Sequence, residues 1–205
     1  LVIGNAMNLS IGPGGAGFVA GGQSIVIERA LSGPLKLSIQ GGSMPGNADK
    51  FDVRLTNAGN SFTGDLVLGD PQGFGSAVLG LTSDGALGAA SNRLILGKSF
   101  FDGESTRGAQ GGLRAWASFS LAADRMVLLD GSAGEEAGFI DTNGHTLVVD
   151  GSIGELASGL GLLKTGAGTL VLNGVQAYSG RTTVNEGTLG GHGEVASLSV
   201  QGAEL

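Results

Sequence analysis

Glycine recurs every few residues along almost the whole chain, and this spacing restricts the possible fold more than any other feature. The 205 residues include 41 glycines, about three times the ordinary usage of about 7 %. Each glycine inside a helix costs about 1 kcal/mol relative to alanine, so the spacing denies the chain long helices. Glycine instead favours tight turns, because it adopts positive φ angles without steric cost.

Short apolar runs of four or five residues lie between the glycines. They are rich in leucine and β-branched residues, and glycine, asparagine or aspartate borders them, which predicts short strands joined by tight turns. The runs are residues 35–39, 65–68, 93–96, 146–149, 169–172 and 197–200. The periodicity of the longest glycine-free stretch, residues 113–130, fits either an amphipathic helix or two strands joined by a turn at residues 122–125. We favour the two strands.

The strand pattern repeats along the chain. Residues 147–151 recur as residues 170–174, an offset of 23, and residues 57–64 resemble residues 173–180, an offset of 116. A period of about 20 to 25 residues fits one coil of a solenoid. The chain then holds about nine coils, which form a rod about 40 Å long at about 4.8 Å per coil.

We therefore predict an all-β fold, a right-handed parallel β-helix that forms an elongated rod. Residues 1–205 are expected to form a single β-helical unit, with repeat-like segments at about 57–100 and 139–200, the second being more regular. Asparagines are expected at the corners, either stacked in a hydrogen-bonded ladder or acting simply as turn formers. They are Asn143, Asn173 and Asn185.

One passage resembles a known repeat. It reads GLLKTGAGTLVLNG at residues 161–174 and continues YSGRTTVNEGTL at residues 178–189. It resembles the passenger-associated repeat of bacterial autotransporters, in which a Lys-x-Gly-x-Gly-Thr-Leu strand precedes an aromatic-Ser/Thr-Gly-Gly-Thr-Thr turn and strand and then a Gly-Thr-Leu. Arg181 stands where that family usually has a second glycine. Residues 139–147 resemble the preceding coil of such passengers.

The resemblance implies a pertactin-like β-helix from the passenger of a Gram-negative bacterium, at the cell surface or secreted. Its implied role is a structural stem, which displays a functional domain and assists passenger folding during outer-membrane translocation by type V secretion. The implied partner is the translocator β-barrel of the same polypeptide, which we do not expect within these residues. Two alternatives stay open. One is an adhesin or other virulence-related surface that binds host surface molecules, and the other is the non-catalytic stem of a secreted protease whose catalytic domain lies upstream.

Charge and cysteine content exclude several kinds of partner and site. Asp and Glu outnumber Lys and Arg by 18 to 11, for a net charge of −7, which argues against nucleic acid or an anionic membrane as partner. The chain has no cysteine, so disulfides and thiolate sites are excluded. No apolar run is long enough for a membrane-spanning helix. The opening residues 1–4 show no signal-peptide pattern, which suggests a piece of a longer protein.

No residue of the chain is predicted to be catalytic, cofactor-binding or metal-binding, and we expect no cofactor and no enzyme activity. Residues 12–17 fit G-x-G-x-x-G, but residues 18–22 cannot form the helix that a dinucleotide site needs. Residues 97–99 resemble only the end of a phosphate loop. His145 and His192 lie in turns, where we expect solvated side chains rather than catalytic bases.

Three further features have a structural explanation as well as a functional one. The adjacent pair Glu135 and Glu136 is expected in a solvated turn, since neighbouring strand residues face opposite sides. Residues 141–144 are too short for a calcium-binding EF-hand loop. Trp116 is either an exposed binding aromatic or, as we expect, a side chain covered by a neighbouring loop.

Overall fold

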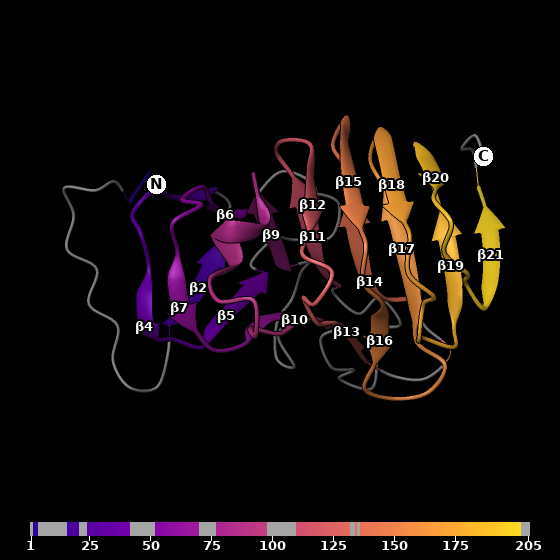
Figure 1. Ribbon diagram of the computed structural model, residues 1–205, viewed down its shortest axis with the longest axis horizontal. Coiled ribbons are helices and arrows are strands. Elements are labelled where there is room, and N and C mark those ends of the chain that lie inside the picture. The colour runs from indigo at the N-terminus through magenta and orange to yellow at the C-terminus, as the bar shows by residue number, and fades with distance from the viewer. Residues whose placement is uncertain are drawn as a thin grey trace.

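Short parallel strands wind around one axis in the computed structural model of the chain (Figure 1). The structure describes residues 2–3, 16–20, 24–41, 52–69, 77–97, 110–131, 134 and 136–201. All pairings between the described strands are parallel. Each strand pairs with strands of the preceding and following coils rather than with its neighbour in sequence. The fold is therefore a parallel β-helix, and the predicted fold class is confirmed.

The longest sheet has nine strands, one from each coil. They are β1 (Val2–Ile3), β3 (Ile25–Ile27), β6 (Val53–Leu55), β9 (Ala77–Leu81), β11 (Gly111–Ala115), β14 (Glu136–Asp141), β17 (Gly161–Thr165), β19 (Arg181–Val184) and β21 (Ser197–Val200). This number agrees with the nine coils that the sequence period predicts. The N- and C-terminal ends lie at opposite ends of an elongated molecule (Figure 1).

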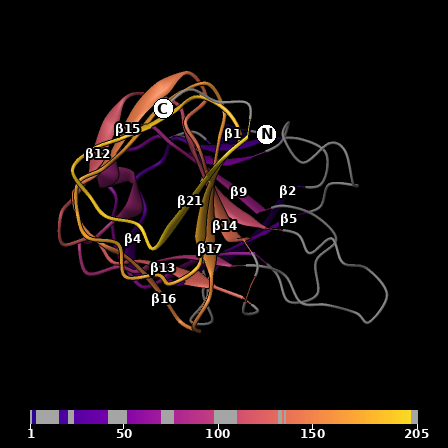
Figure 2. The same cartoon turned by 90° about the vertical axis from the view of Figure 1, so that its right-hand side faces the viewer.

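Two further sides complete the second to sixth coils, as the view along the axis in Figure 2 shows. The second side consists of β4 (Ser32–Pro34) with β7 (Ser61–Thr63), then the single 3-10 turn η1 (Asp84–Leu87), and then a four-stranded sheet. That sheet contains β12 (Phe119–Leu121), β15 (His145–Val149), β18 (Gly168–Leu172) and β20 (Thr188–Gly190). The third side is a six-stranded sheet of β2 (Ala16–Ala20), β5 (Leu37–Gly41), β8 (Leu66–Leu68), β10 (Leu94–Gly97), β13 (Val127–Asp130) and β16 (Ile153–Glu155).

The core consists of columns of aliphatic side chains that stack along the axis. One column of the six-stranded sheet follows the register from coil to coil and is almost fully buried: Leu37, Leu66, Leu94, Val127 and Ile153. Successive strand residues face opposite sides, so every second residue of these strands enters the core. This accounts for the alternating runs between the glycines.

Residues 113–130 form strands, not a helix, with the predicted turn at residues 122–125. Three strands occupy this region rather than two, because the chain bends at residues 116–117 between β11 and β12. The bend is the corner between the nine-stranded and the four-stranded sheet. The alternation of apolar and polar residues predicted the strands. It could not predict the corner at residues 116–117, which contains no glycine.

Of the two sequence repeats, one relates equivalent positions of adjacent coils and the other does not. The offset of 23 is confirmed, since Leu147 pairs with Leu170 and Val149 with Leu172 in adjacent strands. The offset of 116 joins segments on different sides of the helix. Phe62 lies in β7 on the second side, whereas Ala177 donates its backbone N–H to Ile153 O on the third side.

The three corner asparagines do not form a ladder with one another. Asn143 donates Nδ2–H to Ala115 O (3.1 Å), and Asn173 donates Nδ2–H to Asp150 Oδ1 (2.7 Å). Asn185 follows β19 and donates its backbone N–H to Lys164 O (2.9 Å). Asn143 and Asn185 follow strands of the nine-stranded sheet that lie two coils apart, and Asn173 follows a strand of the four-stranded sheet. Turn formation, one of the two predictions, therefore describes them.

Candidate functional site

Three stacked corners join the nine-stranded sheet to the four-stranded sheet in the C-terminal coils. Each contains a glycine with positive φ, namely Gly144 (81°), Gly166 (71°) and Gly187 (74°). A Cβ on Gly166 would overlap the carboxylate of Asp141, and a Cβ on Gly187 would overlap the carbonyl of Gly168. Only glycine fits at the second and third corners, whereas Gly144 has open space where a Cβ would lie.

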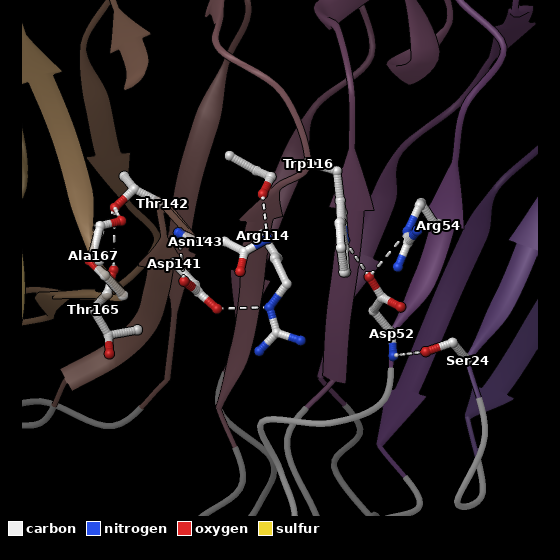
Figure 3. Close-up of polar contacts among 12 residues, drawn as sticks. Ser24, Asp52, Arg54, Arg114, Trp116, Asp141, Thr142, Asn143, Thr165 and Ala167 are labelled. Atoms are coloured by element: carbon white, nitrogen blue, oxygen red, sulfur yellow. Dashed lines mark hydrogen bonds and ion pairs between the residues drawn. The ribbon is translucent and has the colours of Figure 1, made fainter. Parts of the chain in front are cut away.

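Thr142 connects the first corner to the second. It is fully buried, and its Oγ1 lies 3.1 Å from Gly166 O and 2.8 Å from Ala167 O. Its backbone N–H donates to Thr165 O at 3.1 Å (Figure 3). The carbonyls of the second corner therefore accept hydrogen bonds from the coil before it, which is how a turn inside a stack satisfies its polar groups.

Lys164 lies inside the coil. It is 0 % exposed and occupies an inward position between Ile140 of β14 and Val184 of β19. Its Nζ donates to Thr165 O (2.9 Å), Gly166 O (2.6 Å) and Glu186 O (2.8 Å), which uses all three donors of an ammonium group.

Burial lowers the pKa of Lys164 to about 8. The negative charges of Asp141 and Glu186 act in the opposite direction and limit this decrease. The sequence motif included Lys164, but nothing in the sequence indicated that its side chain points inward. A lysine in a strand is ordinarily expected on the solvent side.

Tyr178 and Gln176 occupy the third side after the six-stranded sheet has ended. Gln176 Oε1 accepts the backbone N–H of Ile153 (2.9 Å), and the hydroxyls of Tyr178 and Thr182 are hydrogen-bonded to each other at 2.5 Å. Burial raises the pKa of Tyr178. These buried side chains replace the missing strand and close the coil.

A polar cluster of Asp52, Arg54 and Trp116 lies on the outer face of the nine-stranded sheet (Figure 3). The indole Nε1–H of Trp116 donates to Asp52 Oδ2 (2.5 Å), and the guanidinium of Arg54 lies 3.4 Å from the centre of the indole ring. Arg54 Nε is also 3.5 Å from Asp52 Oδ2. Gly80 of β9 is the register partner of Arg54, and a Cβ there would overlap both the carboxylate of Asp52 and the indole of Trp116.

The Trp116 side chain is half-buried, and among the described residues Arg54 of β6, two strands away in the nine-stranded sheet, covers its ring. Cation–π contacts of this kind are worth about 0.5–1 kcal/mol at exposed sites. Several loops lie outside the described residues, so the predicted cover by a loop stays a prediction.

Arg114 and Asp141 connect the outer face to the corners. Arg114 Nε–H donates to Asp141 Oδ2 (2.6 Å), and Asp141 Oδ1 accepts the backbone N–H of Asn143 (2.8 Å) (Figure 3). The pair joins adjacent coils, because Arg114 and Asp141 are register partners. The Arg114–Asp141 pair thus joins adjacent coils, whereas the contacts of Trp116 with Asp52 and Arg54 connect the fifth coil to the third.

The sequence-predicted candidates lie apart from these clusters. His145 begins β15 half-buried, His192 is exposed, and neither imidazole hydrogen-bonds to a described side chain. Glu136 begins β14, whereas Glu135 lies outside the described residues. Residues 12–15 and 98–99 of the two phosphate-loop-like motifs also lie outside them, and residues 16–20 form β2 rather than a helix.

The described part of the chain shows neither a metal-binding cluster nor a membrane-spanning helix. No group of three or more His, Cys, Asp or Glu side chains is arranged to hold a metal ion there. Among the same residues, no helix has the length and apolar character needed to cross a membrane.

Residues 162–190 match the family described as passenger-associated-transport-repeat. The match covers β17 to β20, with Lys164 and the second and third corners, and it confirms the predicted resemblance to an autotransporter passenger domain. No curated protein and no solved structure matches the chain.

Proposed function

We propose that the chain is the β-helical stem of an autotransporter passenger, which displays a functional domain at the cell surface and assists passenger folding during outer-membrane translocation. The observation that supports this most strongly is the passenger-associated-transport-repeat at residues 162–190. Its strands continue the same sheets as the rest of the helix. The repeat is thus an integral part of the rod.

The same family suggests the location and the partner. Autotransporter passengers are surface-exposed or secreted proteins of Gram-negative bacteria, and a passenger implies a translocator domain in the same polypeptide. A parallel β-helix suits such a role, because each coil contacts mainly its neighbours and can be added as the chain emerges.

The described residues support a structural role over an enzymatic or adhesive one. Their charged clusters join coils to one another, as Asp141 with Arg114 and Lys164 with Glu186 O show. An adhesin would be favoured by a polar or aromatic stripe that repeats at the coil period on one face. The candidate that the sequence offers for it, Trp116, is bonded to Asp52 and stacked with Arg54. We propose that any catalytic activity of the parent protein resides outside this chain.

Deletion of single coils tests the proposal in the passenger joined to its translocator. Removing residues 162–181 places Thr182 where its partner Leu162 was and keeps the register of the stack. We expect this deletion to lower the amount of protease-accessible passenger at the cell surface several-fold. The matched control removes residues 113–139, so that Ile140 takes the place of its partner Leu113.

The control deletion is expected to leave surface display close to the level of the intact passenger. Equal display by both deletion variants and the intact passenger would contradict the proposed role. An equal loss in both variants would mean that the number of coils matters and that the passenger repeat has no special part in translocation.

A further inference from the structure

The sequence of strand β19 specifies its register against β17 only weakly. It reads Arg-Thr-Thr-Val, and Val184 is its one apolar residue. Thr182 and Thr183 are both buried although they face opposite sides of the sheet. Register is specified weakly where a strand lacks a clear apolar and polar face. Something other than hydrophobic pattern must align the eighth coil on the seventh.

Lys164 contacts both coils at this junction. Its ammonium donates to Thr165 O and Gly166 O in its own corner and to Glu186 O in the corner that follows β19. Glu186 O can reach Nζ only when Val184 lies beside Lys164, as it does in the structure. A slip by two residues would keep the same faces of β19 in place but move this carbonyl away from the ammonium.

Burying the ammonium group of Lys164 is not expected to stabilise the folded chain. It is fully buried, and removing a charge from water is unfavourable. Thr165 O, one of its three acceptors, already accepts the backbone N–H of Thr142. The single hydrogen of Thr142 Oγ1 can go to Gly166 O, a second acceptor, or to Ala167 O, which is closer. Buried polar groups of this kind can select one arrangement over its competitors at a cost in stability.

We propose that Lys164 is a register-setting residue, whose internal ammonium selects one alignment of the eighth coil on the seventh without adding net stability. The competing alignments are the two slips by two residues, which place Arg181 or Asn185 opposite Leu163 instead of Thr183. The proposal concerns the folding of this chain and stands apart from the stem function.

Disulfide trapping can read the register, because the natural chain has no cysteine. Leu163 and Thr183 are register partners, about 4.8 Å apart in a parallel sheet, and a disulfide accepts Cα separations of about 4.4–6.8 Å. The native pair is L163C with T183C, and the slipped pairs are L163C with R181C and L163C with N185C. In the native register a slipped pair is about 8 Å apart, beyond the reach of a disulfide.

Each pair is made in the natural chain, in K164M and in I140M. Methionine at position 164 keeps an unbranched side chain but removes the donors, and I140M is the matched control at the neighbouring inward position. We expect slipped disulfides to form at least tenfold more in K164M than in the natural chain, while I140M traps only the native pair. The urea midpoint of K164M without cysteines should equal or exceed that of the natural chain.

Two results would overturn the proposal. One is trapping of the native pair alone in K164M. The other is a failure to fold, or a clear loss of stability, in both K164M and a second variant, K164L. In that second case Lys164 would be a stabilising residue rather than a register-setting one.

Discussion

Glycines with positive φ differ in what surrounds them, and the effect of substituting them should differ accordingly. Gly187 (φ 74°) has carbonyl oxygens of Gly166 and Gly168 where a Cβ would go, whereas Gly33 (φ 84°) has nothing within 4 Å. We expect Gly33→Ala to cost about 1 kcal/mol for the left-handed conformation. Gly187→Ala should cost about 3 kcal/mol, since overpacking adds to that penalty.

Urea unfolding of both glycine variants provides the test, with Gly33→Ala as the matched control for backbone conformation. Equal losses of unfolding free energy would mean that conformation alone matters and that the close stacking of the corners has no energetic effect.

The buried ammonium of Lys164 should make stability depend on pH. Its pKa is about 8 in the folded chain, against an ordinary value of 10.5. Below pH 8 the group is protonated in both states, and the folded state bears the full cost of burying the charge. Between pH 8 and 10.5 the folded state releases the proton first, so the stability of the natural chain rises with pH through this window.

The difference in unfolding free energy between the natural chain and K164M isolates this effect from other titrating groups. We expect the difference to move in favour of the natural chain by up to about 3 kcal/mol as the pH rises from 7 to 10.5. A difference that stays constant, or moves the other way, would show that the folded state does not disfavour the charged form.

At the scale of a single strand, β19 offers a direct comparison of two neighbouring threonines. Both are buried, but Thr182 Oγ1 is hydrogen-bonded to the Tyr178 hydroxyl, whereas Thr183 Oγ1 has no partner among the described residues. Thr182→Val should cost about 1–2 kcal/mol, because it also leaves the tyrosine hydroxyl unpaired. Thr183→Val should be neutral or stabilising, because it removes a buried polar atom without a partner.

Chemical denaturation of the two valine variants measures both effects in the same strand. Tyr178→Phe in the Thr182→Val background serves as a control, since it should recover part of the lost stability by removing the unpaired hydroxyl. The reverse order of stability for the two valine variants would contradict the hydrogen bond between Tyr178 and Thr182.

Strand positions could be predicted from the sequence, but contacts between distant coils could not. Leu147 and Leu170 were matched because neighbouring coils have similar local sequences. Trp116 and Asp52 are separated by 64 residues, and no period relates them, because the coils between them differ in length. Lys164 follows the strand alternation that places Leu162 inward, although a charged side chain ordinarily lies on the solvent side. Its acceptors become visible only once the corners are stacked.

At the scale of the whole molecule, the coils shorten toward the C-terminus from the fourth coil onward. Register partners in the nine-stranded sheet lie furthest apart in sequence at Gly80 and Arg114, closer at Leu162 and Thr182, and closest at Thr182 and Leu198. The six-stranded sheet ends at β16, so the last coils have strands on two sides only. Shorter coils lose less entropy on closing, but they also enclose a smaller core.

The sequence also predicts the order in which the coils unfold, and the coil lengths bear on that prediction. Residues 161–200 have regular strands, whereas residues 41–47, 69–75 and 97–112 interrupt the N-terminal half, so the C-terminal coils are expected to open last. Most residues of the interruptions lie outside the described part of the chain. Leu198 in the last coil is 44 % exposed, so we do not expect the last coil to belong to the most stable region.

Hydrogen exchange in moderate denaturant can measure this order, since it reports local opening free energies. We expect the amides of β17, β18 and β19 to stay protected longer than those of β8 and β10, with terminal residues excluded because open sheet edges fray. Solenoid stability is approximately a sum over coils and their interfaces, so the order can vary along one rod. If the family's passengers emerge C-terminus first, a stable segment near that end can fold outside the cell before the rest arrives and oppose backward movement. Longer protection of the amides around Leu66 and Leu94 than of those around Leu170 and Val184 would place the most stable coils elsewhere and remove this mechanism.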